Sequence, residues 1–241
     1  MTASALRGGI IAAGEGSRLR ADGFTVPKPM VPVAGVPLIE AVIGNFRAAG
    51  ITSLVVIVNE DERACAEWLP ARFPSLDLTC IVKTTPSSLR SFAEVVSAPG
   101  AGPMLVSTVD AWCPPADFVR FVDAARRHPA SRSVLGLTPF VADEKPLRAT
   151  LDAGGRITAL GAGALVTAGL YLVSERVRAL APDARHDRLR DFLAWLVAEG
   201  EPLYGEVIPR VIDVDRAEDV ALAEALSLTI TREPSVAKKG L

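Results

Sequence analysis

A short apolar strand that leads directly into a glycine-rich turn constrains the fold of this chain most strongly. Residues 8–13 are apolar and typical of a buried strand, and Gly14 and Gly16 follow at once. Glycine lets the backbone turn sharply and approach a ligand closely, and the N–H groups of such a turn can face an anion. Arg18 and Lys28 add two positive charges nearby. The stretch therefore predicts a strand, a turn and a helix that together bind a polyphosphate.

Two common phosphate-binding patterns do not fit this stretch. A dinucleotide-binding turn has the pattern G-x-G-x-x-G, and its third glycine would stand where this chain has Leu19. A P-loop has the pattern G-x-x-x-x-G-K-[ST], which occurs nowhere in the sequence. A glycine-rich turn beside two solvated cations, with no ligand, is the simpler alternative.

A third pattern fits in two separate strings. Residues 12–19 read A-A-G-E-G-S-R-L and residues 27–30 read P-K-P-M. Together they resemble the signature of the NTP-transferase family, which includes sugar-1-phosphate nucleotidyltransferases, cytidylyltransferases and relatives that act on phosphocholine, inositol phosphate or the molybdenum cofactor. The resemblance implies a nucleotide site formed by Ala12, Ala13, Gly14, Gly16 and Ser17. In it, Arg18 would contact the β- and γ-phosphates, and Lys28 would lie near the reacting centre.

Strands and helices alternate along most of the chain. Apolar strands are expected over residues 8–13, 53–58, 76–83 and 104–108, and amphipathic helices over 38–49, 60–69, 87–96 and 115–128. This alternation predicts an α/β fold with a doubly wound, mostly parallel, Rossmann-like sheet. The family resemblance implies the nucleotide-diphospho-sugar transferase type of that fold. Residues 149–158 predict a small β-hairpin insertion that turns at Gly154 and Gly155. We expect one domain over residues 1–231 and a flexible tail over 232–241.

Two aspartates are candidates for a magnesium site. Asp110 follows the strand 104–108, and the string around it resembles the family's strand-end aspartate, which holds Mg²⁺. Residues 211–220 resemble a later family string whose first aspartate, here Asp213, is the second metal ligand. That string departs from the family because Arg216 replaces threonine and the preceding tryptophan is absent. Mg²⁺ prefers such hard carboxylate oxygens. Asp110 could instead cap the segment that follows its strand, and Asp213 and Asp215 could be turn residues.

These residues indicate a nucleotidyltransferase with Arg18, Lys28 and Asp110 in the catalytic centre. It would transfer a nucleoside monophosphate from an NTP to a phosphorylated small molecule and release pyrophosphate. Because the acceptor is itself an anion, the reaction needs alignment and cations more than a general base. A molybdenum-cofactor nucleotidyltransferase and a non-catalytic nucleotide-binding relative are the alternatives.

The base and the acceptor depend on two further stretches. Ser87 and Ser88 are candidates for reading the base or for capping a helix. Residues 85–89 resemble cytidylyl and molybdenum-cofactor relatives more than sugar relatives, and this resemblance favours CTP. Residues 166–171 resemble the segment that lines the acceptor pocket. The lysine that contacts the acceptor phosphate in sugar relatives has no counterpart in residues 159–164. Arg148 or Arg210 could replace it, or the acceptor could carry its own cation, as phosphocholine does, and need less neutralisation. We therefore expect an amino-alcohol, polyol or inositol phosphate in preference to a hexose-1-phosphate.

Composition excludes other classes of partner. The formal net charge is -2 and charged residues make up 22% of the chain, so nothing indicates binding to nucleic acid or to a membrane. No apolar run is long enough to span a bilayer, and the three cysteines show no paired spacing. A cytoplasmic location is expected, and the sequence leaves open whether the protein forms a homodimer.

Overall fold

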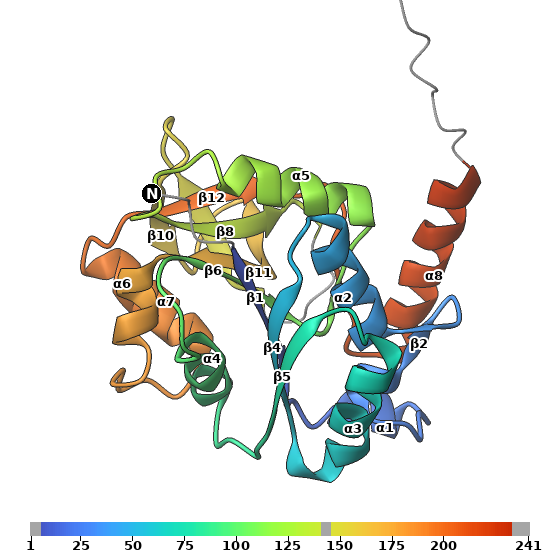
Figure 1. The fold of residues 1–241 in the computed structure, drawn as a ribbon. Helices are drawn as coiled ribbons and strands as arrows, with labels where there is room; N and C mark the ends of the chain where they lie inside the picture. Colours follow the sequence, from blue (N-terminus) through green and yellow to red (C-terminus); the bar gives the residue numbers. More distant parts are fainter. Residues whose placement is uncertain (1–5, 141–145, 233–241) are drawn as a thin grey trace, which may run out of the picture.

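The computed structural model describes residues 6–140 and 146–232, which fold around one large twisted sheet (Figure 1). In the described part of the chain the sheet contains nine strands. Seven follow one another across the sheet in the order β10 (Ile157–Leu160), β9 (Arg148–Leu151), β11 (Leu165–Val173), β6 (Met104–Thr108), β1 (Arg7–Ala12), β4 (Ser53–Val58) and β5 (Asp77–Val82). The other two are β8 (Ser133–Thr138), which pairs with β11, and β12 (Leu203–Val207), which pairs with β8.

Strands β5, β4, β1 and β6 are parallel, and this half of the sheet carries the predicted Rossmann-like arrangement. Strand β11 runs antiparallel to β6, β8 and β9, so the other half of the sheet is mixed. Chain order goes outward from β1 to β4 and β5 and then returns to β6 on the far side of β1. Ligands in open α/β sheets bind at the carboxyl ends of strands where the order reverses in this way, which places a site beyond β1 and β6.

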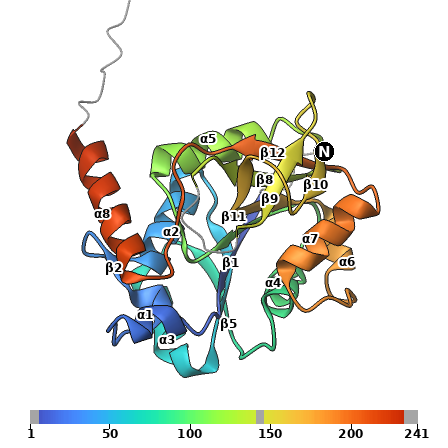
Figure 2. The same ribbon diagram turned by 180° about the vertical axis from the view of Figure 1, so that it is seen from behind.

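Helices cover both faces of the sheet (Figures 1 and 2). Their bounds are α1 (Ser17–Ala21), α2 (Leu38–Ala48), α3 (Arg63–Arg72), α4 (Ser88–Val96), α5 (Pro115–Ala125), α6 (Glu175–Leu180), α7 (Leu189–Ala198) and α8 (Ala217–Arg232). Helices α4, α6 and α7 lie on one side of the parallel strands, and α2 and α3 lie on the other. None of the helices described is both long and apolar enough to cross a bilayer.

Strand β4 shows why the sequences of the parallel strands are continuous apolar runs. Leu54 and Val56 belong to the core on the side of α2 and α3, whereas Val55 and Ile57 belong to the core on the side of α4. Successive side chains of a strand point to opposite faces, so a strand covered on both faces needs apolar residues at every position. The predicted α/β fold class is confirmed.

The hairpin insertion is confirmed as β9 and β10, whereas several boundaries differ from the prediction. The helix expected from residue 60 begins with a single 3₁₀ turn, Glu60–Glu62, because the Asn59 side chain accepts the Asp61 N–H. The expected loop after the Pro-Lys-Pro string contains a tiny hairpin of β2 (Pro32–Val33) and β3 (Val36–Pro37). Of the expected tail, Arg232 ends α8, and residues 233–241 lie outside the described residues. The single-domain organisation stays a prediction.

Candidate active site

The glycine turn after β1 brings the two predicted phosphate-binding cations together. Ala12 ends β1, Gly16 caps α1, and Ser17 is the first residue of that helix. Gly16 has φ 61° and ψ 30°, a left-handed conformation that favours glycine. A Cβ at Gly16 would lie 2.7 Å from the Cβ of Lys28, so the turn also needs glycine for this close approach. The sequence pattern therefore packs the turn directly against Lys28.

Lys28 is the most buried cation of the site, with 7% of its side chain exposed. It lies between Pro27 and Pro29 and starts a short 3₁₀ turn, Lys28–Met30. Its Nζ lies 2.6 Å from Asp110 Oδ2 and also donates to Asp215 Oδ1. Burial alone would lower the pKa of Lys28, but the two carboxylates raise it above its ordinary value. Lys28 is therefore held as an ammonium ion.

The C-terminal part of the chain reaches the site through a short strand pairing. Strand β13 (Ile212–Asp213) pairs with β7 (Ala111–Trp112), directly after Asp110. The Val214 N–H donates to the Asp110 carbonyl oxygen at 3.0 Å, which fixes the two segments further. These contacts explain how two aspartates so distant in sequence come to share one site.

Asp110, Asp213 and Asp215 offer carboxylate oxygens that all lie within 4.8 Å of one another. Hard oxygen donors at this spacing fit a divalent cation such as Mg²⁺. Burial would raise the pKa of Asp110, but the Lys28 ammonium holds it below its ordinary value, so the carboxylate is ionised. Asp213, the predicted second ligand, thus lies beside Asp110, and Asp215 joins them.

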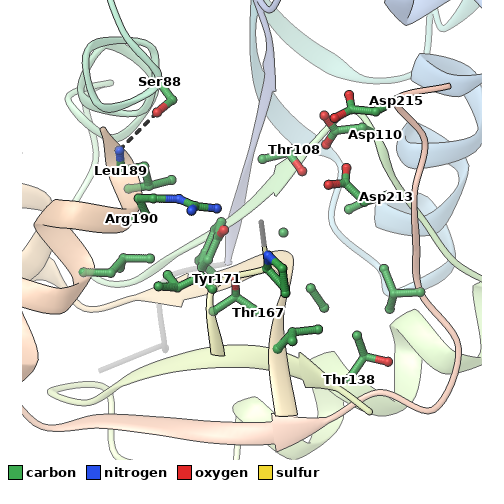
Figure 3. A pocket seen from close by; sticks show the side chains of 18 of the residues that line it. Ser88, Thr108, Asp110, Thr138, Thr167, Tyr171, Leu189, Arg190, Asp213 and Asp215 are labelled. Carbon is green, nitrogen blue, oxygen red and sulfur yellow. Dashed lines mark hydrogen bonds between the residues drawn. The ribbon is translucent and has the colours of Figure 1, made fainter. Parts of the chain in front are cut away.

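A cavity of about 560 Å³ opens beside this cluster, beyond the carboxyl end of β6. Figure 3 shows the three aspartates gathered at one side and Arg190 reaching in from the side of α7. Arg18 lines the same cavity. The predicted acceptor segment lines it through Val166, Thr167, Ala168, Gly169 and Tyr171. Arg18, the three aspartates and the acceptor segment therefore face one space, and Lys28 lies behind Asp110.

Sequence reasoning missed two arginines of this cavity. Arg188 and Arg190 flank Leu189 at the start of α7, and all three line the cavity. The signal was an arginine pair at a helix N-terminus, which the amphipathic pattern alone does not distinguish from a solvated face. Tyr171 lies within reach of Arg190: burial raises the pKa of its hydroxyl, as do Asp110 and Asp213, and Arg190 opposes them.

The two arginines expected to replace the missing lysine are engaged elsewhere. Arg148 Nη1 donates to the carbonyl oxygen of Gly163 at 3.2 Å. Arg210 Nε donates at 2.9 Å to the carboxylate of Asp117, which is 1% exposed. Within the residues described, Arg188 and Arg190 line the cavity and these two arginines do not.

The predicted base-reading serines hold the helices beside the cavity. Ser87 caps α4, because its hydroxyl accepts the Arg90 N–H at 3.3 Å. The Ser88 hydroxyl accepts the Leu189 N–H at 3.1 Å and joins the N-termini of α4 and α7. Ser88 also lines the cavity, whereas its contact with a base stays a prediction.

The fold and this cavity together define an α/β protein with a glycine turn and an acidic cluster at the switch point of its sheet. Residues 8–203 match the family model of the MobA-like NTP transferase domain. This match covers most of the chain, and the protein belongs to that family. The predicted family and its class, nucleotidyltransferase, are confirmed.

Curated relatives match over shorter segments. The chain is 30% identical over 154 residues to a 2-C-methyl-D-erythritol 4-phosphate cytidylyltransferase of Nocardia farcinica, a match that covers 61% of this chain and 60% of that protein. It is 39% identical over 70 residues to a 2-aminoethylphosphonate cytidylyltransferase of Lancefieldella rimae, covering 29% of this chain and 28% of that one. A match to a CMP-5'-(3-aminopropyl)phosphonate synthase of Streptomyces rubellomurinus is 29% identical over 90 residues and covers 37% of this chain but 14% of that protein.

Solved structures share the whole fold. The inositol-1-phosphate CTP transferase from T. maritima superposes with a TM-score of 0.79 at 19% identity, over 93% of this chain and 96% of that chain. A putative glucose-1-phosphate thymidylyltransferase from Bacillus anthracis has a TM-score of 0.80 at 17% identity, over 92% and 95% of the two chains. At these identities the likeness establishes the fold.

Proposed function

We propose that this protein transfers a nucleoside monophosphate from an NTP to a phosphorylated small molecule and releases pyrophosphate. The observation that carries the proposal is that Arg18 and the acidic cluster face the same cavity as the acceptor segment, with Lys28 directly behind Asp110. Nucleotidyl transfer needs such an arrangement, because the reacting phosphates carry negative charge that must be neutralised while they are aligned.

The chain's own residues divide this work by position. The backbone of the Gly14 to Gly16 turn would cradle the triphosphate, with Arg18 on the β- and γ-phosphates and Lys28 near the α-phosphorus. Asp110 and Asp213 would hold Mg²⁺, which when bound supplies positive charge for the reacting phosphates. The acceptor needs no general base, because its phosphate is already an anion at neutral pH. Positioning and charge neutralisation therefore carry the catalysis.

CTP is the nucleotide that we favour. Residues 85–89 resemble cytidylyl and molybdenum-cofactor relatives, and the three curated relatives above carry names that refer to cytidylyl transfer or to a CMP product. The T. maritima protein with the same fold is likewise named for CTP.

For the acceptor, we propose a small phosphate or phosphonate held by Arg188 and Arg190. A guanidinium can pair with such an anion through two parallel hydrogen bonds. Arg190 lies across the cavity from the acidic cluster (Figure 3), and Arg188 lines the same cavity, as does the acceptor segment. An aminoalkyl, polyol or inositol group fits the names of the relatives, and it agrees with the absence of the lysine that sugar relatives use.

The test is a panel of four NTPs against phosphate and phosphonate acceptors, with pyrophosphate release as the readout. The expected result is turnover with CTP and an amino-alcohol, aminoalkylphosphonate, polyol or inositol acceptor. The Asp110→Asn protein is the control for contaminating activity. Tight NTP binding without turnover on any acceptor would support a non-catalytic relative, and turnover with GTP and a molybdopterin acceptor would support the MobA-type reaction.

A further inference from the structure

One carboxylate, that of Asp215, contacts both phosphate-binding cations through different oxygen atoms. Its Oδ1 accepts from Lys28 Nζ, and its Oδ2 accepts from Arg18 Nη1 at 3.0 Å. The Asp215 side chain is 32% exposed, so water screens these contacts only in part. Asp215 therefore joins two cations that come from separate strings of the sequence.

The backbone around Asp215 is itself fixed by a buried partner. The Asp219 side chain, 7% exposed, accepts the N–H of Asp215 at 3.0 Å and that of Arg216 at 2.8 Å. Lys28 is buried too, whereas the Arg18 side chain is 43% exposed and extends from the five-residue helix α1. Of the two partners of Asp215, Arg18 is thus the one with the more exposed side chain.

We propose that Asp215 is a positioning residue that holds Arg18 and Lys28 in the nucleotide-free protein and gives them up to the phosphates of the incoming nucleotide. The inference rests on the proposed function, which assigns both cations to the triphosphate. Phosphate oxygens accept the same hydrogen bonds as a carboxylate, so the exchange conserves the number of charged contacts. Asp215 would keep the two cations in place. A polyanion would have to displace the carboxylate from both cations, so one that contacts them poorly would bind weakly.

The competing role for Asp215 is that of a third metal ligand beside Asp110 and Asp213. Both of its carboxylate oxygens already accept from cations of the chain. A metal ligand would influence binding only when the metal is present. A cation holder would influence the binding of polyphosphate in EDTA as well, and the two roles therefore separate in a metal-free experiment.

The first measurement is calorimetric binding of inorganic tripolyphosphate in EDTA. Asp215→Asn should bind it at least about threefold more tightly than wild type, which corresponds to releasing an ion pair of about 0.7 kcal/mol. Arg18→Ala should bind it more weakly. In the Arg18→Ala background, Asp215→Asn should still be compared with its parent, and the logarithm of its gain in affinity should be half or less of the value found in the wild-type background. Asp215→Glu should keep wild-type affinity, because the longer side chain retains the charge.

The same set of single and double variants, a double-mutant cycle, contains the results that would overturn the proposal. An unchanged or weaker affinity for Asp215→Asn would do so, as would a gain that persists in full without Arg18, since that gain would reflect net charge alone. Failure of both wild type and Asp215→Asn to bind tripolyphosphate would show that the cations form no phosphate site. Asp152→Asn, in the exposed hairpin turn, is the charge-matched control and should bind like wild type.

A kinetic measurement with the best NTP tests the positioning role in the reaction. Asp215→Asn should lower kcat at least about tenfold while the KM for NTP stays unchanged or falls, because released cations bind phosphate but are misplaced in the transition state. A merely structural defect would raise KM and lower the melting temperature instead. If wild type turns over no NTP, the proposed function fails, and the tripolyphosphate cycle still decides the role of Asp215.

Discussion

Lys28 Nζ lies 2.6 Å from Asp110 Oδ2, and this contact joins the segment after β1 to the end of β6. Those are the two strands at which the chain order of the sheet reverses. The ammonium is buried and its pKa is raised, and the pKa of its carboxylate partner is lowered. The pair therefore stays ionised over the neutral pH range, and it places a fixed cation behind the acidic cluster of the cavity.

Removal of either cation that we propose to bind the phosphates, Lys28 or Arg18, should reduce activity strongly. Lys28→Ala and Arg18→Ala are each expected to cost about 3–4 kcal/mol of transition-state stabilisation, as the loss of a preorganised donor does. Lys28→Ala should also lower the free energy of unfolding, because Asp110 loses its buried partner. The measurements are kcat/KM and urea denaturation. Near wild-type kcat/KM in a stable Arg18→Ala protein would show that the triphosphate lies elsewhere.

Activity should require a divalent cation held by Asp110. Asp110→Asn keeps the shape of the side chain but removes the charge, so turnover should fall by two orders of magnitude or more, in line with the loss of a key electrostatic group (about 10²-fold). The measurement compares turnover in Mg²⁺ and in EDTA for both proteins. Equal rates of the wild-type protein in the two buffers would rule out the metal site.

The glycine turn offers a matched pair of substitutions. Gly16→Ala forces a side chain into a left-handed conformation and places its Cβ 2.7 Å from the Cβ of Lys28. We expect a loss of about 1–3 kcal/mol of stability and a displaced Lys28, with reduced kcat. Gly14→Ala meets no atom within 4 Å and should fold like wild type. Melting curves and kcat of the two variants test this, and equal stability would contradict the packing argument.

How much of this site the sequence could predict depended on whether a residue belongs to a local pattern. Gly16, Arg18 and Lys28 lie in two short sequence strings whose residues stand at characteristic spacing, so these three residues were predictable. The strand before them is buried on both faces, so its continuous apolar run was predictable too. Arg190 was not, because its place in the cavity depends on how α7 packs beside α4, a long-range contact that local periodicity does not encode. The position of Asp215 likewise depends on the pairing of β13 with β7.

Glu62 should make stability depend on pH. Burial raises the pKa of its carboxyl from 4.5 to about 7, and its Oε2 has no hydrogen-bond partner among the described residues. Between pH 4.5 and about 7 the folded protein therefore binds more protons than the unfolded chain, so stability falls as pH rises through this window. Glu62→Gln should remove this loss, which is on the order of 2 kcal/mol.

Urea denaturation at pH 4.5 and pH 8 measures the effect of Glu62→Gln against wild type. The advantage of the variant should be larger at pH 8, and Glu60→Gln, at an exposed neighbouring position, is the control. A difference between variant and wild type that is the same at both pH values would show that the buried carboxyl does not titrate in this range.

Arg190 should determine the affinity for the acceptor rather than for the nucleotide. It reaches into the cavity from α7, on the side away from the aspartates, and its charge reaches Tyr171 at the cavity wall (Figure 3). Loss of a hydrogen-bonded charge on an anion costs about 1.5–3 kcal/mol, so Arg190→Ala should raise the acceptor KM by tenfold or more. The KM for NTP should change less than about threefold.

Arg148→Ala, which removes a surface arginine bound to a carbonyl oxygen, should leave both KM values near those of wild type. Equal increases in both KM values for Arg190→Ala would place the acceptor phosphate elsewhere, because a cation that serves the acceptor alone cannot weaken the nucleotide to the same extent.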